Sequence, residues 1–287
     1  MGSIPAESLF LHPIRRISSP PHGYVSMLRW CAYCQEFQGE VAPLDTYATT
    51  HGICPVCKAK GIGRLDTEIG NSHRVRDIQE LLYEAGKTGE VAAASSIVHR
   101  AFEAGLRPVD ILVGIITPLL YRIGAEWESH EITVADEHRF TSFCERVFEL
   151  VKLEAITAGA PNQGDCHAQV FLTNARGNSH TLGIRIVALW LQSKGIETRE
   201  FDPPPSAEAL VELVAEIRPQ AILISLALDR QKSYVWAIAQ RLEALQHPRP
   251  TLIVGGYAIK QKLVSPIPGA LFFETITGLD DFIWTLK

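Results

Sequence analysis

The chain has 287 residues, of which 46% are hydrophobic and 21% charged, and its formal net charge is −5. This composition is typical of a globular protein, and the length predicts about two domains at about 150 residues each, with room for a small third. The acidic balance argues against nucleic-acid binding through bulk positive charge, and apolar runs of about a dozen residues are shorter than the roughly 20 that a transmembrane helix needs.

Residues 1–24 are rich in proline and show little hydrophobic periodicity, so they are predicted to form a surface tail. They contain no basic stretch followed by an apolar one, so we expect no secretory signal and a cytoplasmic location. Residues 25–66, 72–158 and 166–287 differ in pattern from this tail and from one another, and each is predicted to be a separate domain.

Residues 25–66 contain two C-x-x-C pairs separated by nineteen residues, 35–53. The pairs are Cys31 with Cys34 and Cys54 with Cys57. Two such turns can hold four thiolates tetrahedrally around zinc. A segment of about forty residues buries too little apolar surface to be stable alone, so we expect a structural zinc site that supplies its stability. Two ordinary reduced pairs and a redox pair are the alternatives.

Residues 72–158 show apolar residues at spacings of three and four, which is the helical period. Four helices are predicted, over about 74–85, over about 90–104, from Pro108 onward and from about Thr133 onward. Thr133 and Asp136 resemble a capping box at the start of the fourth helix. Short connections favour antiparallel neighbours, so this part is predicted to be a four-helix bundle.

A small, polar run over residues 158–164 is predicted to link the bundle to the last part of the chain. Residues 166–287 then alternate between short apolar runs and helical patterns. The strands are predicted at 170–173, 197–201, 221–224, 251–254 and 271–273, with helical patterns after the first three and a last segment at 280–286. This alternation predicts a doubly wound parallel sheet of Rossmann-like type, in which ligands bind at the carboxyl ends of the strands.

The first of these strands is followed by Gly177-Asn-Ser-His-Thr-Leu-Gly183, which places His180 at a carboxyl end where a helix opens. Taken alone, His180 would be read as a loop or capping histidine. Polar and glycine residues also follow the third and fourth strands, so a binding edge is predicted. Its candidate residues are Asn178, Ser179, His180, Gly183, Ser225, Gly255 and Gly256.

This set resembles the cobalamin-binding domain, whose motif reads Asp or Glu-x-His-x-x-Gly, followed by a serine motif and then Gly-Gly. The resemblance implies that His180 replaces the cofactor's own base as the lower cobalt ligand, while the displaced tail enters the core of the sheet. The acidic residue of the family motif is Asn178 here. An amide accepts a hydrogen bond but adds no negative charge to raise the basicity of an imidazole, so a weaker axial bond is expected.

Trp127 is followed after nine residues by Glu137-His138, at the same end of the predicted bundle. Alone, these residues would be read as a core tryptophan beside a solvated pair. With the previous motif they resemble the light-sensing cobalamin proteins, and the resemblance extends over about 210 of the 287 residues. It implies adenosylcobalamin as cofactor, with Trp127 on the adenosyl group, Glu137 at its ribose and His138 as the cobalt ligand after light breaks the cobalt–carbon bond.

Members of that family with a winged-helix domain bind DNA, whereas this chain has cysteine pairs in its place, so direct nucleic-acid binding is not expected. The predicted function is a non-catalytic light sensor that acts through a protein partner or a light-dependent homo-oligomer, and a bilin is the second chromophore that this resemblance would allow. The alternative is a corrinoid methyl-carrier protein of a methyltransferase system. A radical mutase would need a barrel of about 250 residues, for which the chain has no room.

Overall fold

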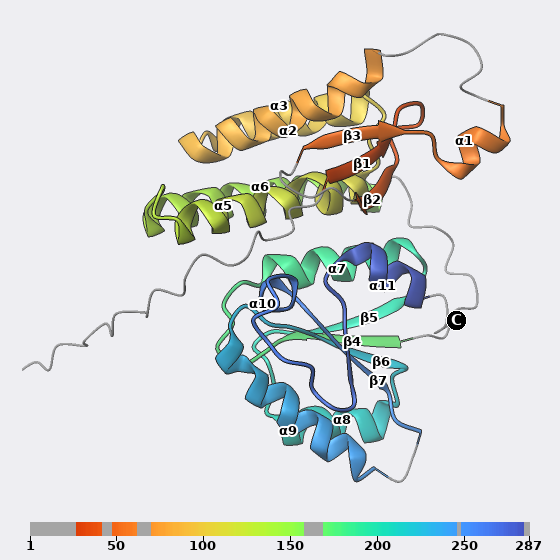
Figure 1. Ribbon diagram of the computed structural model, residues 1–287, viewed down its shortest axis with the longest axis vertical. Coiled ribbons are helices and arrows are strands. Elements are labelled where there is room, and N and C mark those ends of the chain that lie inside the picture. The colour runs from red at the N-terminus through yellow and green to blue at the C-terminus, as the bar shows by residue number, and fades with distance from the viewer. Residues whose placement is uncertain (1–26, 42–47, 62–69, 158–168, 246–247, 284–287) are drawn as a thin grey trace, which may run out of the picture.

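The computed structural model describes residues 27–41, 48–61, 70–157, 169–245 and 248–283. The tail predicted at residues 1–24 and the linker predicted at 158–164 lie outside the described residues. The described parts form a small cysteine-containing sheet, a helical bundle and a parallel sheet covered by helices on both faces (Figure 1). The predicted fold class is therefore confirmed.

The cysteine-containing segment, defined here as the described residues of 27–61, is a three-stranded sheet with one short helix, a structure that the sequence did not predict. Its elements are β1 (Met27–Cys31), β2 (Phe37–Val41), β3 (Thr49–Gly52) and α1 (Pro55–Ala59). Strand β1 is central, antiparallel to β2 and parallel to β3. Leu28 and Trp30 are fully buried among residues of the bundle, whereas Cys31 packs with the other cysteines.

Four helical rods form the bundle, as the spacing of apolar residues predicted. They are α2 (Gly70–Thr88), α3 (Val91–Glu103), the continuous run of α4 (Pro108–Ile111), η1 (Leu112–Ile116) and α5 (Thr117–Glu128), and α6 (Val134–Thr157). The π-helical turn η1 comes just before Pro118, whose ring lacks an N–H and crowds the carbonyl four residues back. The capping contact at α6 is confirmed, since the Thr133 backbone N–H donates to Asp136 Oδ2 at 3.0 Å and the Asp136 N–H donates to Thr133 Oγ1 at 3.2 Å.

The third rod, Pro108–Glu128, corrects the expectation that no segment is long and apolar enough to cross a membrane. By length and hydropathy alone this helix qualifies, because the apolar residues flanking the run at 110–121 extend it. In the protein 56% of its apolar window is buried, and Ile111, Ile115 and Leu119 lie in the core between the other helices. Its apolar character is therefore explained by packing within the bundle.

The last part alternates strands and helices as predicted. Its strands are β4 (Gln169–Asn174), β5 (Glu197–Phe201), β6 (Ala221–Ser225), β7 (Thr251–Gly255) and β8 (Ala270–Phe272). Its helices are α7 (Leu182–Ser193), α8 (Ala207–Ile217), η2 (Asp229–Gln231), α9 (Lys232–Glu243), α10 (Tyr257–Lys260) and α11 (Ile276–Ile283). All neighbouring strands are parallel, in the order β5-β4-β6-β7-β8, so the topological switch point lies between β4 and β6.

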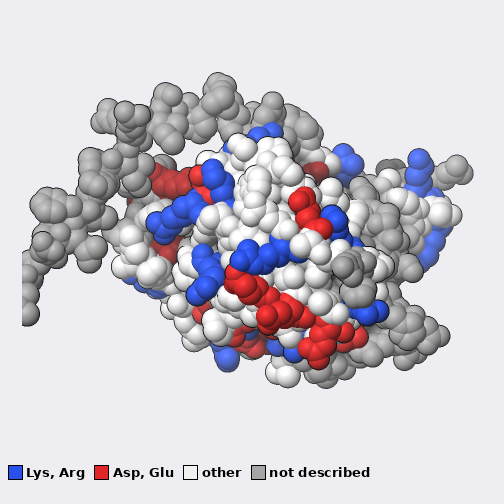
Figure 2. Space-filling view, turned by 90° about the horizontal axis from the view of Figure 1, so that it is seen from below, with Lys and Arg blue, Asp and Glu red and all other residues white. Residues whose placement is uncertain are grey.

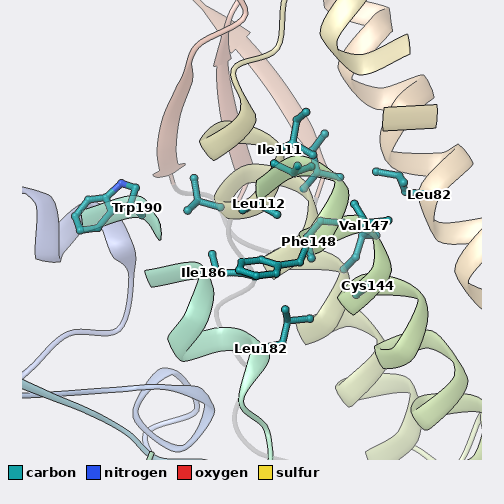
Figure 3. Packing of buried hydrophobic residues seen from close by; sticks show 14 of the residues in the cluster. Leu82, Ile111, Leu112, Cys144, Val147, Phe148, Leu182, Ile186 and Trp190 are labelled. Atoms are coloured by element: carbon teal, nitrogen blue, oxygen red, sulfur yellow. The ribbon is translucent and has the colours of Figure 1, made fainter. Parts of the chain in front are cut away.

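The bundle and the parallel sheet share one hydrophobic core. Phe148 of α6 lies beside Leu182 and Ile186 of α7, with Leu112 of η1 above them (Figure 3). Helices α7 and α11 lie on the face of the sheet toward the bundle, and α8 and α9 cover the opposite face over a second apolar cluster (Figure 1). The position of the bundle is thus fixed relative to α7, the helix that begins two residues after His180.

The face seen from below in Figure 2 carries acidic and basic side chains side by side. Helices α8 and α9 lie at that end of the molecule, and Glu208 of α8 pairs there with Arg241 of α9. Lys232 and Asp229 form a second pair at the start of α9, with Nζ and Oδ1 2.9 Å apart. Opposite charges at this end therefore compensate one another in pairs.

Candidate functional site

Three strand ends meet at one edge of the parallel sheet. In the strand register Asn174 of β4 lies opposite Ser225 of β6, and Ser225 lies opposite Gly255 of β7. Gly256 follows with φ of 98° and ψ of −178°, a conformation that is essentially restricted to glycine. A Cβ atom there would lie 2.5 Å from the Leu226 carbonyl oxygen, so the backbones after β6 and β7 approach as closely as they can.

The loop after β4 is held by two buried amides. Asn178 donates from Nδ2 to the Ser225 carbonyl at 3.2 Å and to Asn174 Oδ1 at 3.4 Å, and its Oδ1 accepts the backbone N–H of His180 at 3.0 Å. Asn174 donates from Nδ2 to the His180 carbonyl at 3.3 Å. The backbone of His180 is therefore held on both sides.

This arrangement explains the departure at Asn178 from the acidic family motif. A carboxylate could accept the His180 N–H, but it could not donate to the Ser225 carbonyl. Asn178 thus connects the ends of β4 and β6 and binds the backbone of His180. The sequence analysis did not name Asn174 as a candidate. The one signal that could have found it is that a polar residue stands at the end of an apolar strand.

Beyond the buried Asn178, this loop faces open space. His180, Ser179 and Gly183 are exposed, and a Cβ atom built at Gly183 would meet nothing within 4 Å. Leu228, just beyond β6, is 43% exposed and adds an apolar side chain close to the same edge. An exposed imidazole with room around it suits a metal ligand, and an apolar neighbour suits a large cofactor with an apolar face.

The end of α5 extends toward this edge. Tyr121 stacks on Tyr257 of α10 with ring centroids 6.2 Å apart, and a Cβ atom at Gly124 would lie 3.9 Å from the Tyr257 ring. Trp127 follows Gly124 by three residues, about 300° around the helix and so about 60° short of one full turn, and it is 45% exposed. Figure 1 shows the α5–α6 end of the bundle on the same side of the molecule as α10.

Glu137 and His138 lie in the first turn of α6, as predicted. Glu137 Oε1 accepts the Thr141 hydroxyl at 2.8 Å, and its Oε2 lies 3.6 Å from His138 Nε2. The His138 side chain is 74% exposed and that of Glu137 is 17% exposed. Within the described residues no hydrogen bond or ion pair joins this pair to Trp127 or His180.

The four cysteines predicted to bind zinc come together in the cysteine-containing segment. Their sulfur atoms all lie within 4.8 Å of one another, and the Sγ atoms of Cys34 and Cys54 are 3.7 Å apart. A tetrahedral zinc site with zinc–sulfur bonds of about 2.3 Å places its sulfurs about 3.8 Å apart. The Cys54 N–H donates to Cys31 Sγ at 3.4 Å, and the Cys57 N–H donates to Cys54 Sγ at 3.3 Å.

The cysteines differ in how readily they lose a proton: burial raises the pKa of Cys34 and of Cys57, whereas the pKa of Cys31 is lowered. Burial raises the pKa of its thiol, but hydrogen bonds from the backbone of Cys34, Cys54 and Tyr33 outweigh burial and bring the pKa to about 7. Thiolates are the metal-binding form of cysteine. All four cysteines are free thiols, so the donor set fits a single tetrahedral ion.

Comparison with known families decides what the two larger parts are. Residues 78–152 match one family model described as a B12 binding domain, and residues 168–270 match a second model with the same description. Both parts of the chain belong to B12-binding families. The first B12-binding part is the helical bundle, and the second is the parallel sheet with its His180 edge.

Proteins similar to this B12-binding chain include an uncharacterized protein and corrinoid proteins. An "uncharacterized 20.5 kDa protein in bchF-crtJ intergenic region" of Rhodobacter capsulatus is 29% identical over 163 residues, 56% of this chain and 83% of that protein. Monomethylamine corrinoid protein 2 of Methanosarcina acetivorans is 24% identical over 148 residues, 52% of this chain and 67% of that protein. The solved Methanosarcina barkeri monomethylamine corrinoid protein has a TM-score of 0.63 at 18% identity, covering 74% of this chain and 99% of that chain, which supports the fold.

Proposed function

We propose that this B12-binding protein holds cobalamin at the carboxyl edge of the parallel sheet, with His180 as the lower cobalt ligand, and serves as a corrinoid carrier. The observation that carries the proposal is the pair of amides, Asn174 and Asn178, that fix the backbone of an exposed histidine at the topological switch point. When bound, cobalamin supplies a cobalt–carbon bond that can be made and broken.

The chain's own residues then have distinct roles. Asn174 and Asn178 fix the backbone of His180, so that the loop carrying its imidazole need not be ordered when the cofactor binds. Ser225 and the close backbone approach at Gly256 line the edge where the displaced nucleotide tail would enter.

The carrier function is favoured by the corrinoid proteins among the relatives. In that function the chain performs no turnover alone, and a methyl group would pass to and from separate partner enzymes. The upper face of the cofactor must then become accessible, so the α5–α6 end of the bundle must be able to move away from the His180 edge.

A second candidate function is light sensing with adenosylcobalamin, and a different observation favours it. Trp127 exposes an indole at the end of α5, one turn beyond the contact of Gly124 with Tyr257. An aromatic lid there would stack on an adenosyl group, with Glu137 and His138 nearby at the start of α6. A movement of the bundle would have to loosen the Phe148 contacts with α7, and the output would be a change in self-association or in binding to a protein partner.

The two functions share a binding test. Purified protein is titrated with hydroxocobalamin, and the absorption spectrum is compared for wild type, His180→Ala and the control His99→Ala, in which an exposed histidine paired with Glu103 on α3 is lost. Wild type and the control should give the same spectrum, without the cofactor's own base on cobalt. His180→Ala should bind more weakly or keep that base, and an unchanged spectrum in this variant would contradict the proposal.

A second experiment separates the two functions. Protein loaded with adenosylcobalamin in the dark is exposed to green light, followed by absorption and size-exclusion chromatography. A lasting spectral change with altered assembly that is lost in Trp127→Ala or His138→Ala supports sensing. No lasting change, with methyl transfer from methylcobalamin-loaded protein to the acceptor substrate of an added methyltransferase, supports the carrier. A long-wavelength absorption band in the same spectrum would reveal a bilin.

A further inference from the structure

The cysteine-containing segment is packed against the third rod of the bundle at its π-turn. Trp30 of β1 and Phe37 of β2 form a tilted aromatic pair with centroids 5.2 Å apart. A Cβ atom on Gly114 of η1 would lie 2.5 Å from Trp30 Cζ2 and 2.8 Å from Phe37 Cδ2. The two rings therefore sit directly on the helix backbone, and Trp30 belongs to the same core as the bundle.

A buried carboxylate and a partly exposed ion pair complete this contact. Asp110 of α4, which is 2% exposed, accepts the Phe37 N–H at 3.3 Å and the Arg107 Nε–H at 2.6 Å. Arg107 also pairs with Glu36, next to β2, with Nη1 and Oε1 2.9 Å apart. The segment is thus joined to the bundle by apolar, hydrogen-bonded and ionic contacts together.

The same segment also reaches the B12-binding sheet domain. Lys260 of α10 donates to both carboxylate oxygens of Glu40 on β2, at 2.9 and 2.8 Å, and the two side chains are only 8% and 13% exposed. The Lys260 ammonium also lies 4.4 Å from the ring centroid of Tyr121 on α5. One lysine therefore joins the cysteine-containing segment, the bundle and the sheet domain.

Lys260 is closely connected to the cofactor edge. Helix α10 has four residues and begins directly after Gly256. Its Ala258 N–H donates to the Leu226 carbonyl at 3.1 Å, the oxygen against which Gly256 is packed. With so short and tightly bonded a helix, displacement of Lys260 would also displace the backbone after β7 from the end of β6.

We propose that the cysteine-containing segment is a metal-dependent strap that positions the cofactor loop, and that Glu40 and Lys260 are its positioning residues. Zinc on the four cysteines would hold β2 in place, β2 would hold Lys260 through Glu40, and α10 would hold Gly255–Gly256 against Ser225. Zinc occupancy and cobalamin affinity are then linked, and by reciprocity cobalamin binding strengthens zinc retention. This inference rests on the proposed binding of cobalamin at the His180 edge.

The test compares hydroxocobalamin affinity in zinc-loaded and chelator-treated full-length protein. In wild type, removal of zinc should weaken binding on the order of tenfold, within the range usual for coupled sites. Lys260→Glu should weaken binding about as much while zinc is present, and removal of zinc should then have little further effect. The double variant Glu40→Lys with Lys260→Glu should restore both the affinity and its dependence on zinc.

A matched control is Lys262→Glu, the same charge change two residues further on, where the lysine is 62% exposed and lies 3.9 Å from Glu274. It should bind as wild type does. If Lys260→Glu does not fold, as judged by circular dichroism, Glu40→Gln tests the same contact with little change of shape. The proposed strap is wrong if wild type binds hydroxocobalamin equally well with and without zinc. It is also wrong if the double variant Glu40→Lys with Lys260→Glu does not restore binding. Absence of cobalamin binding in zinc-loaded wild type would instead overturn the proposed function.

Discussion

Gly256→Ala tests how tightly the cofactor loop is built. The backbone at Gly256 has φ of 98° and ψ of −178°, and alanine in this region costs about 1–3 kcal/mol. The new methyl group would also lie 2.5 Å from the Leu226 carbonyl oxygen and 2.8 Å from Ser225 Oγ, and relief of such overpacking costs typically about 1–3 kcal/mol. The free energy of unfolding should therefore fall by about 2–6 kcal/mol.

Gly195→Ala is the matched control, because Gly195 has φ of 78° and a Cβ atom there would meet nothing within 4 Å. It should cost only about 1 kcal/mol for the backbone conformation. At about 2 °C per kcal/mol for a chain of this size, Gly256→Ala should lower the melting temperature by about 4–12 °C and the control by about 2 °C. Hydroxocobalamin titration should show weaker binding in Gly256→Ala alone. Equal melting temperatures and equal affinities in the two variants would refute the reasoning.

Further predictions concern the cysteine site, the contact of the cysteine-containing segment with the bundle, and the residues of the bundle that would cover the upper face of the cofactor. Cys54→Ser should remove about one zinc per chain in metal analysis, and zinc-free wild type with an ordered segment would contradict the metal site. Gly114→Ala should be less stable than Gly124→Ala by about 1–3 kcal/mol in thermal unfolding, because only the first methyl group would strike aromatic rings; equal stabilities would exclude that contact. Trp127→Ala should lose the preference for adenosylcobalamin over methylcobalamin in competition titrations, whereas an unchanged preference would remove Trp127 from the upper lid. His138→Ala should fail to form the stable light-state spectrum, if the protein is a light sensor, and an identical spectrum would exclude His138 as the upper ligand.

The order of helices and strands followed from local patterns, and these were sufficient for the fold class. The apolar stripe at Ile111, Ile115 and Leu119 marks a helix, and the apolar run at 221–224 marks a buried strand, because side-chain spacing reports the period of each element. The π-turn within the third rod was not predicted. It adds one residue to a single helical turn, and the spacing of the apolar residues around it stays nearly the same.

Contacts between distant segments were beyond the sequence. The motif at the His180 loop placed Asn178 near the histidine but gave no sign that its amide would bind the carbonyl of Ser225, 47 residues away. Likewise, the cysteine spacing predicted a metal site, whereas the packing of Trp30 on Gly114 and the pairing of Glu40 with Lys260 depend on tertiary structure. What a short motif encodes is the chemistry of a site, and its connections to the rest of the protein arise from folding.

The central claim, that His180 is the lower ligand of cobalt, is tested most directly by electron paramagnetic resonance of the cobalt(II) form of the bound cofactor. A nitrogen atom bound to cobalt below the corrin ring splits each cobalt hyperfine line of this spectrum. The line becomes a triplet if the nitrogen is ¹⁴N and a doublet if it is ¹⁵N. Protein prepared with ¹⁵N-labelled histidine and unlabelled cobalamin should show doublets, and labelled His180→Ala should not. Triplets in labelled wild-type protein would mean that the cofactor keeps its own base, and would contradict the account.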